Sequence, residues 1–230
     1  SRPPKIPSNI LLQHFQGYLV NSEDEIFDEK TVILMDFRCD QSRGMHFIYL
    51  LPFSKNIAFV ESTVFSKQLE PNEFYVKEIF KYLKKYYNLK TFTKSNHEKG
   101  IIPMHDVSLK SKGIHNIGTR GGAVRPSSGY AFTFIQKQVL QIIDQLILGR
   151  KINTNIHNKV DLFLDKIFIQ VIDLYPEIAP TIFSNLAKTI NGDEMASFMS
   201  GNCNFKTKCK VIFSMPKIPF IKSFFKIMNK

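Results

Sequence analysis

The chain has 230 residues, 43% of them hydrophobic, which is enough to bury a substantial core and excludes a disordered or fibrous protein. Thirty-one basic residues against twenty acidic ones give a net charge of +11, which suits nucleic acid, a phosphate-bearing cofactor or an anionic lipid surface, although a generally lysine-rich composition gives the same excess. We expect no nucleic-acid partner, because no zinc-finger, helix-turn-helix or RNP-like pattern is present.

The first third of the chain alternates apolar and polar residues in short runs, a pattern typical of an antiparallel meander. The runs cover residues 10–20, 31–38, 44–52 and 56–65. From Asn72 the apolar spacing becomes that of an amphipathic helix, whose lysines fill the remaining face. The residues expected on its buried face are Val76, Ile79, Phe80, Leu83 and Tyr87.

The rest of the chain is predicted to be mostly helical. Two extended segments, residues 100–107 and 113–118, lead into a glycine-rich loop. A helix follows over residues 131–146 and ends before Gly149, a natural C-terminal cap, and another covers 160–174 and stops before Pro176. Shorter helices are expected over 180–189 and 193–199. The stripe expected to be buried on the first of these helices is Ala131, Phe134, Ile135, Val139, Ile142, Ile143 and Leu146.

The glycine-rich loop, residues 118–132, places four glycines and a proline directly before a long helix. Gly121 and Gly122 have no Cβ, so a flat or phosphorylated ligand can lie against bare backbone. The N–H groups that open the next helix favour an electron-rich partner. The loop fits no standard phosphate-binding fingerprint, so an ordinary loop that caps a helix remains an equal alternative.

One carboxylate has the setting of a general acid. In the strand IAFVEST, alternation places Glu61 on the same face as Ile57, Phe59 and Thr63. Apolar neighbours raise the pKa of a carboxyl group toward the range in which it can donate and recover a proton. The alternative is a strand carboxylate on the wet side of the sheet, paired with a lysine.

Other reactive residue types form no recognisable site. Asp36 and Arg38 share a strand face and are expected to form an ion pair that acts as a structural brace. The histidines lack metal-ligand spacing, and no serine or cysteine has the neighbours of a nucleophile. The three cysteines are expected to be free thiols, and no apolar run reaches the roughly 18 to 20 residues that cross a bilayer.

Five segments together resemble the flavin-dependent lycopene cyclases of bacterial carotenoid biosynthesis. They are QHFQGY (13–18), MDFR (35–38), FVEST (59–63), GIIPM (100–104) and the glycine-rich loop (118–132), and the resemblance runs from about Gln13 to Phe220. Enzymes of that family begin with a βαβ dinucleotide-binding unit carrying G-x-G-x-x-G, which this chain lacks. The chain therefore resembles the C-terminal portion of such an enzyme, and its start at Ser1, without Met or signal peptide, agrees with a fragment.

The resemblance implies an α/β protein, α+β within this fragment. An antiparallel substrate-domain sheet is joined by the later part of an FAD-binding Rossmann-like domain and by C-terminal helices. Residues 1–112 would form the mostly antiparallel substrate-binding region with one helix, residues 113–150 the flavin-contacting loop and helix, and residues 151–230 the C-terminal helical region with a basic aromatic tail.

The resemblance also implies a reaction and its residues. Glu61 would be the acid–base residue, and Asp36 and Arg38 would support the pocket. The reaction would be the non-redox cyclisation of lycopene to β-ionone rings, with FAD in its reduced form and NAD(P)H as its reductant. The enzyme would be an isomerase, and the fragment alone is expected to be inactive. Five loop residues would border the flavin: Gly121, Gly122, Pro126, Ser128 and Gly129.

The tail suggests where such a substrate is met. No acidic residue follows Glu194, while lysines and phenylalanines alternate to the end of the chain. A basic aromatic tail suits anionic lipid, so we expect peripheral attachment to the inner face of the cell membrane from the cytoplasm. A packed terminal helix with a solvated lysine face is the alternative.

Two other function classes remain open from the sequence. One is a flavin-dependent hydroxylase or other FAD oxidoreductase of the same fold, which would need no acid such as Glu61. The other is a non-catalytic basic binding module. The sequence leaves open the oligomeric state, β against ε rings, and whether one or both ends of lycopene are cyclised.

Overall fold

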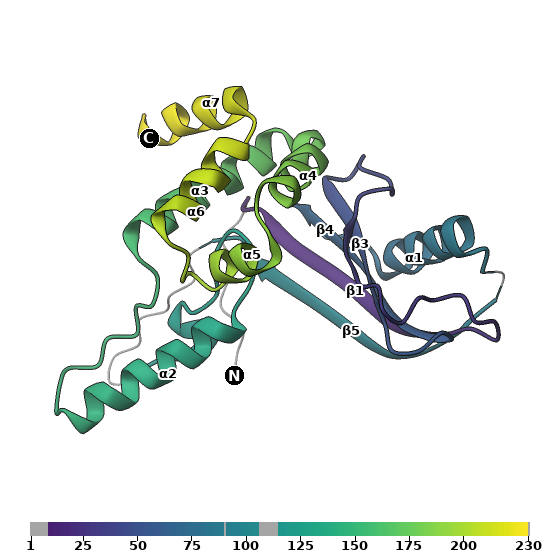
Figure 1. The fold of residues 1–230 in the computed structure, drawn as a ribbon, viewed down its shortest axis with the longest axis horizontal. Helices are drawn as coiled ribbons and strands as arrows, with labels where there is room; N and C mark the ends of the chain where they lie inside the picture. Colours follow the sequence, from purple (N-terminus) through teal and green to yellow (C-terminus); the bar gives the residue numbers. More distant parts are fainter. Residues whose placement is uncertain (1–8, 90, 106–114, 230) are drawn as a thin grey trace. The chain divides into compact units, whose positions relative to one another are not determined.

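A computed structural model describes residues 9–89, 91–105 and 115–229 of the chain (Figure 1). The chain divides into two compact units, and each is considered by itself. Leu11–Ile102 forms the first, and Pro103 with the described residues after it belongs to the second. The boundary at Ile102 lies near the end of the predicted 1–112 region, whereas the predicted 113–150 and 151–230 regions share one unit.

The first unit contains a five-stranded sheet with the strand order β2-β3-β4-β1-β5. Its strands are β1 (Leu12–Asn21), β2 (Ile33–Asp36), β3 (Met45–Pro52), β4 (Ile57–Ser66) and β5 (Thr93–Pro103). The pairs β1/β4, β3/β4 and β2/β3 are antiparallel, as predicted. The predicted meander is confirmed for β2, β3 and β4 and is wrong for β1, which lies beside β4 and not beside β2.

The predicted extended segments after the first helix were placed too late. β5 already begins at Thr93 and ends at Pro103, and residues 106–107 of the predicted 100–107 segment lie outside the described residues. Residues 113–114 also lie outside them, and from 115 to 117 the backbone forms no strand. The polar residues of Thr93–Lys99 conceal this strand, because they are exposed and break the expected apolar alternation.

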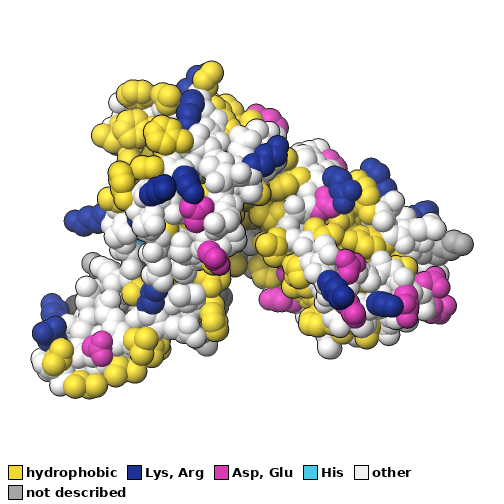
Figure 2. All heavy atoms as spheres, in the orientation of Figure 1, with side chains coloured by type: hydrophobic (Ala, Val, Ile, Leu, Met, Phe, Trp, Pro, Cys, Tyr) yellow, Lys and Arg dark blue, Asp and Glu magenta, His cyan; other side chains and the backbone are white. Residues whose placement is uncertain are grey.

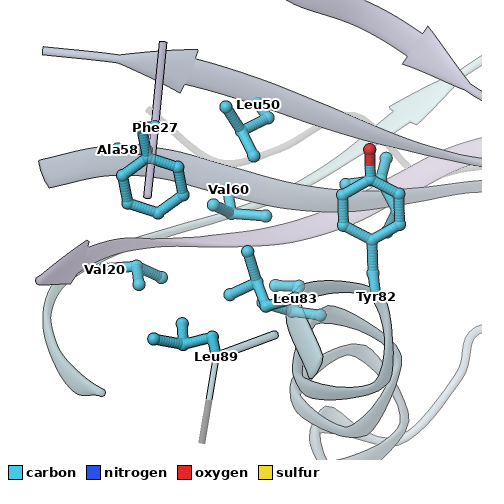
Figure 3. Packing of buried hydrophobic residues seen from close by; sticks show 10 residues of the cluster. Val20, Phe27, Leu50, Ala58, Val60, Tyr82, Leu83 and Leu89 are labelled. Atoms are coloured by element: carbon cyan, nitrogen blue, oxygen red, sulfur yellow. The ribbon is translucent and has the colours of Figure 1, made fainter. Parts of the chain in front are cut away.

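Helix α1 (Asn72–Tyr87) covers one face of the sheet, as predicted for an amphipathic helix. The predicted buried face is only partly right: Ile79 and Leu83 are buried, but Phe80 is 39% exposed. Tyr75 and Tyr82 are buried instead. Figure 3 shows Tyr82 and Leu83 of α1 directed toward Leu50, Val60 and their neighbours on the strands. The helix ends at Asn88, which takes the left-handed conformation with φ 52°. We call this side of the sheet the helix face. Its core residues are Val20, Phe27, Ile48, Leu50, Ala58, Val60, Ile79, Tyr82, Leu83 and Leu89.

The second unit is helical in its described residues. After the 3₁₀ turn η1 (Gly118–Gly121) come α2 (Phe132–Ile147), α3 (Lys159–Leu174), the turn η2 (Pro176–Ile178), α4 (Ala179–Thr189), α5 (Gly192–Met199), α6 (Phe205–Ser214) and α7 (Lys217–Met228). Gly149 follows α2 with φ 61°, a left-handed conformation that suits glycine, so the predicted C-terminal cap is confirmed. α3 packs against α7, and α4 packs against α6.

Most of the apolar stripe predicted to be buried on α2 is half-buried or exposed. Only Phe134 and Gln138 of this helix are buried, whereas Ile143 is 44% and Leu146 60% exposed. The prediction failed because periodicity identifies an apolar face and carries no information on what covers it.

Candidate functional site

Strand β4 presents Glu61 and Ser62 to opposite faces of the sheet, because side chains alternate along a strand. Ser62 lies on the helix face. Glu61 lies on the other side, with Tyr49 of β3 and Gly17 of β1 as its register partners. We call this side the Glu61 face. It is formed by the side chains of Met45, Phe47, Tyr49, Phe59, Glu61, Thr63 and Phe65, together with the β1 residues paired with them.

Glu61 is a buried carboxyl group. Only 8% of its surface is exposed, and Oε1 accepts a hydrogen bond of 2.7 Å from the hydroxyl of Thr63. Burial raises the pKa of Glu61 to about 7, the Thr63 hydrogen bond opposes that rise, and the negative charge of Glu98 adds to it. The predicted apolar setting and the direction of the pKa shift are thus confirmed, and the alternative of a wet strand carboxylate paired with lysine is wrong.

Aromatic rings surround this carboxyl group on the Glu61 face. The ring of Phe47 lies 5.1 Å from that of Tyr49 and 6.0 Å from that of Phe65. Gly17 makes room for another ring, because a Cβ at that position would lie 2.4 Å from Cζ of Phe59 and 3.0 Å from Cβ of Glu61. A carboxyl group with a pKa near neutrality among aromatic rings can protonate an apolar substrate and recover the proton.

Asp36 and Arg38 form the predicted ion pair. The guanidinium Nε donates to Oδ1 of Asp36 at 2.9 Å and the terminal nitrogen Nη2 to Oδ2 at 2.5 Å, and the hydroxyl of Tyr82 donates to Oδ2 at 2.6 Å. Burial opposes ionisation, but the hydrogen bonds from Arg38 and Tyr82 hold the pKa of Asp36 below its usual value. Asp36 pairs in register with Ile48, so the cluster lies on the helix face. The structure does not bring it together with Glu61.

Two buried histidines on the helix face form polar contacts that sequence reasoning missed. His46 Nε2 lies 2.9 Å from the hydroxyl of Ser62, and its Nδ1 lies 2.8 Å from the carbonyl oxygen of Asp40. His14 bonds to the hydroxyls of Tyr75 at 2.6 Å and Ser66 at 2.9 Å. Burial lowers the pKa of His14 to about 4 and also lowers that of His46, so both are neutral histidines packed in the core. His105, expected in a strand, lies beyond the end of β5.

The glycine-rich loop of the second unit is held by a side chain that the sequence did not single out. Gln138 of α2 is fully buried, accepts a hydrogen bond of 2.7 Å from the amide of Gly118, and donates to the carbonyl oxygens of Gly121 at 2.9 Å and Thr154 at 2.7 Å. Its signal in the sequence is a glutamine within an apolar helix. The loop is therefore fixed at its first turn by α2 itself.

A buried ion pair fixes the second half of the loop. Arg125 bonds both carboxylate oxygens of Asp165 on α3 at 3.2–3.3 Å and donates to the carbonyl of Phe198 at 2.9 Å. Ser127 donates to the same carboxylate at 2.7 Å. Neither charged group was predicted, because the partners lie 40 residues apart. A loop braced in this way has a defined shape for a ligand to meet.

The five predicted loop residues differ in their surroundings. Gly122 and Gly129 have φ values of 76° and 69°, a conformation that favours glycine, and Ser128 is half-buried beside Gly129. Pro126 is buried. At Gly121 a Cβ would lie 2.4 Å from the carbonyl oxygen of Asn116, so the missing side chain there makes room for the chain's own backbone.

The hydrogen bonds of the loop amides limit which part of a ligand can lie against the glycine-rich loop. The N–H groups of Gly121, Gly122 and Ala123 donate within the loop, to Ile117, Thr119 and Gly118 respectively. They are therefore not available as a phosphate cradle. A flat ring that packs against backbone fits better, since the glycines at 122 and 129 present no side chain.

Several other kinds of site have no support in the described part of the chain. No group of histidine, cysteine and acidic residues there has the arrangement of a metal site. The three cysteines are free thiols, as expected. None of the described helices is both long enough and apolar enough to span a bilayer.

The comparison with known families agrees with this arrangement. A family described as "Lycopene cyclase protein" matches residues 1–224, nearly the whole chain. The chain belongs to the lycopene cyclase family.

Individual relatives are distant. A chloroplastic neoxanthin synthase from Solanum tuberosum is 26% identical over 136 residues, which cover 54% of this chain and 27% of that protein. Two solved structures align with 95% of the chain at a TM-score of 0.47: a geranylgeranyl bacteriochlorophyll reductase-like protein from Thermoplasma acidophilum (14% identity) and the flavin-dependent brominase Bmp2 (12% identity). The alignments cover 55% and 56% of those chains, so this chain spans about half their length.

Proposed function

We propose that the chain is the catalytic portion of a lycopene β-cyclase, an isomerase in which Glu61 is the acid and the base. The observation that supports this most strongly is the buried carboxyl group of Glu61, whose pKa burial raises to about 7, among the aromatic rings of the Glu61 face. At neutral pH such a group exists in both protonation states, as an acid–base residue requires.

The reaction is an isomerisation in which the proton is returned. Protonated Glu61 adds its proton to the terminal double bond of an acyclic end group, which leaves a carbocation. An inner double bond attacks the cation and closes a six-membered ring, and the carboxylate of Glu61 then removes a proton from a neighbouring carbon. Water would trap the cation as an alcohol, so the rings of Phe47, Tyr49 and Phe59 serve to exclude it.

FAD is the cofactor that the proposal requires. Gly122, Ser128 and Gly129 would lie against its flat ring, on a loop that Gln138 and Arg125 keep in shape. Reduced FAD, maintained by NAD(P)H, would supply electron density that stabilises positive charge. The amides of Gly121 and Gly122 would not hold the phosphates of the dinucleotide, because both are already paired.

The test uses the chain fused behind the dinucleotide-binding region of a related cyclase, expressed in bacteria that accumulate lycopene. The unaltered fusion is expected to form β-carotene by way of γ-carotene, read by pigment chromatography. Glu61→Gln should lower the cyclisation rate by about 10³-fold or more, with flavin content unchanged, because an amide cannot replace the acid. The chain without the fused region should be inactive.

Glu78→Gln is the matched control. Glu78 is also buried, with 5% of its surface exposed, but it lies on α1 and pairs with Lys81 at 2.6 Å. That variant should keep full activity. A folded, flavin-loaded Glu61→Gln fusion that still forms rings would contradict the proposal, and an oxidised or hydroxylated product from both proteins would favour a flavin-dependent oxidoreductase.

We also propose that α6 and α7 bind the cytoplasmic surface of the membrane, where the carotene substrate is dissolved. Ile218, Ile221, Phe225 and Met228 follow helical spacing on α7 and are each at least 54% exposed. Figure 2 shows hydrophobic side chains gathered with lysines at the top of the view, where Figure 1 places α7. An exposed apolar stripe beside cationic side chains suits an anionic lipid surface.

Not every lysine of the tail is available for that surface. Lys208 pairs with Asp161 at 2.7 Å and Lys210 pairs with Glu194, so both stabilise the packing of α6. Lys222 and Lys226 of α7 are exposed. The double variant Ile221→Ser/Phe225→Ser should lose co-sedimentation with phosphatidylglycerol vesicles, while Phe53→Ser, an exposed phenylalanine of the first unit, should keep it. Equal sedimentation of the two variants would refute the membrane role of α7.

A further inference from the structure

Thr63 lies on the Glu61 face, and its hydroxyl donates a hydrogen bond to Glu61. We propose that Thr63 is a positioning residue: its hydroxyl holds Oε1 of Glu61, so that Oε2 is the oxygen that gives the proton to the substrate and recovers it. This inference rests on the proposed cyclase function, and it assigns a task within it to a residue with no assigned role.

The geometry around Thr63 leaves its hydroxyl directed to one partner. Thr63 is fully buried, and its Oγ1 lies 2.7 Å from Oε1 of Glu61. Its register partners on the neighbouring strands are Phe15 of β1 and Phe47 of β3, which carry no polar side-chain atoms. A hydroxyl enclosed by aromatic residues gains most from the carboxyl group beside it, because leaving it unpaired would be costly.

The other groups near Glu61 do not hold it. Tyr49 faces it from β3, and burial together with the charge of Glu61 raises the pKa of that phenol to about 12, so Tyr49 remains neutral. Gly17 of β1 has no side chain. Glu98 of β5 is exposed and acts on Glu61 only through its negative charge. Within the described residues, no hydrogen bond reaches Oε2 of Glu61, so this oxygen is free to meet a substrate.

The hydrogen bond also favours the proton transfer. When the proton leaves Oε2 for the terminal carbon of the substrate, negative charge spreads over both carboxylate oxygens. The bond from Thr63 to Oε1 then becomes charge-assisted and strengthens. The carboxylate recovers a proton at Oε2 when the ring has closed, so the hydroxyl of Thr63 keeps its own proton throughout. An interaction that grows stronger as charge develops lowers the barrier.

The first experiment measures the pKa of Glu61 in the 230-residue chain, without flavin or substrate. Infrared spectra recorded across a pH series, after subtraction of the Glu61→Gln spectra, isolate the carboxyl band of this residue. Thr63→Val should raise the pKa of Glu61 by about one unit, because it removes a hydrogen bond to the charged form. Thr63→Ser keeps a hydroxyl and should restore the original value.

Two further variants keep the test decisive. Thr63→Ala also lacks the hydroxyl and is smaller, so it serves if valine does not fit. Ser62→Ala is the matched control, because it removes an equally buried hydroxyl from the residue of β4 that precedes Thr63. The hydroxyl of Ser62 contacts His46 on the helix face and not Glu61. Ser62→Ala should leave the pKa of Glu61 unchanged. An unshifted pKa in folded Thr63→Val or Thr63→Ala would overturn the role of Thr63, whatever reaction the enzyme performs.

The second experiment separates this inference from the proposed function. In the fused enzyme, Thr63→Val should lower the maximal cyclisation rate about three- to tenfold and shift the alkaline limb of its pH profile upward with the pKa. Thr63→Ser should restore both. If the pKa of Glu61 moves in the chain but the pH profile of the fusion does not follow, the hydrogen bond stands and the acid role of Glu61 fails.

Discussion

The buried polar groups on the two faces of strand β4 differ in their hydrogen-bond partners. On the helix face, Ser62 bonds to His46, and Asp36 is bonded by both Arg38 and Tyr82, so each group is enclosed by partners. On the Glu61 face, one hydroxyl group bonds a carboxyl group whose surroundings are otherwise aromatic. A buried polar group that is fully paired stabilises the fold, whereas one that is only partly paired costs stability.

That difference separates a structural brace from the proposed acid–base residue within one sheet. The pKa of Asp36 is lowered, which means that its charged form is stabilised where it lies. The pKa of Glu61 is raised to about 7, mainly by burial, which means that its charged form is destabilised. Natural proteins retain such unfavourable groups at active sites. Replacing each residue should therefore have opposite effects on stability.

The largest effect is expected for Asp36→Ala. The variant removes the partner of the buried hydroxyl of Tyr82 and of the Arg38 guanidinium, so the free energy of unfolding should fall by about 2 to 3 kcal/mol at pH 7. Urea unfolding followed by circular dichroism measures this loss. Because the pKa of Asp36 is lowered, the difference from the unaltered chain should shrink as the pH falls below about 4.

Asp28→Ala is the control for that measurement, because Asp28 is an exposed carboxylate that bonds only within its own turn. It should change stability far less than Asp36→Ala. Equal unfolding curves for Asp36→Ala and the unaltered chain would show that the ion pair is not the brace that its geometry indicates.

The next effect has the opposite sign. Glu61→Gln should stabilise the first unit at pH 8 by on the order of 2 kcal/mol, since each unit of pKa shift corresponds to about 1.4 kcal/mol and glutamine carries no charge to bury. A carboxyl group whose pKa is raised by folding contributes its full stability when the pH is below its pKa in the unfolded chain, near 4.5. That contribution is lost as the pH rises through its pKa in the folded chain, about 7. The gain should therefore vanish near pH 4.5.

The free energies of unfolding of Glu61→Gln and the unaltered chain must be compared at the same pH, because acid also lowers stability through groups on the helix face. The pKa of His14 is lowered to about 4, so the folded state resists its protonation and stability falls as the pH drops below about 6.5. This loss is common to Glu61→Gln and the unaltered chain. Glu78→Gln, which removes a carboxylate paired with Lys81, should give no gain at pH 8. A Glu61→Gln variant that is destabilised at pH 8 would refute the raised pKa.

The sequence predicted local relations well and distant ones poorly. Alternation in β4 placed Glu61 beside Thr63, and the two-residue spacing of Asp36 and Arg38 predicted their ion pair. Tyr82 bonds Asp36 from 46 residues away, and no periodicity links the two positions. The same limit applies to Gln138, which bonds the glycine-rich loop across 17 to 20 residues, and to the pairing of Arg125 with Asp165.

The smallest effect on stability is expected for Gly17→Ala, and it tests whether the space beside Glu61 is used by aromatic rings. The new Cβ would lie 2.4 Å from Cζ of Phe59, so the ring must move, at a cost of about 1 kcal/mol. Gly192→Ala is the control, since a Cβ there meets nothing within 4 Å. In the fused enzyme, Gly17→Ala should slow cyclisation far more than its small stability loss explains. The new Cβ would press on both the ring of Phe59 and Cβ of Glu61. If activity falls no more than it does in Gly192→Ala, the position of the Phe59 ring is a matter of packing, and Glu61 acts without it.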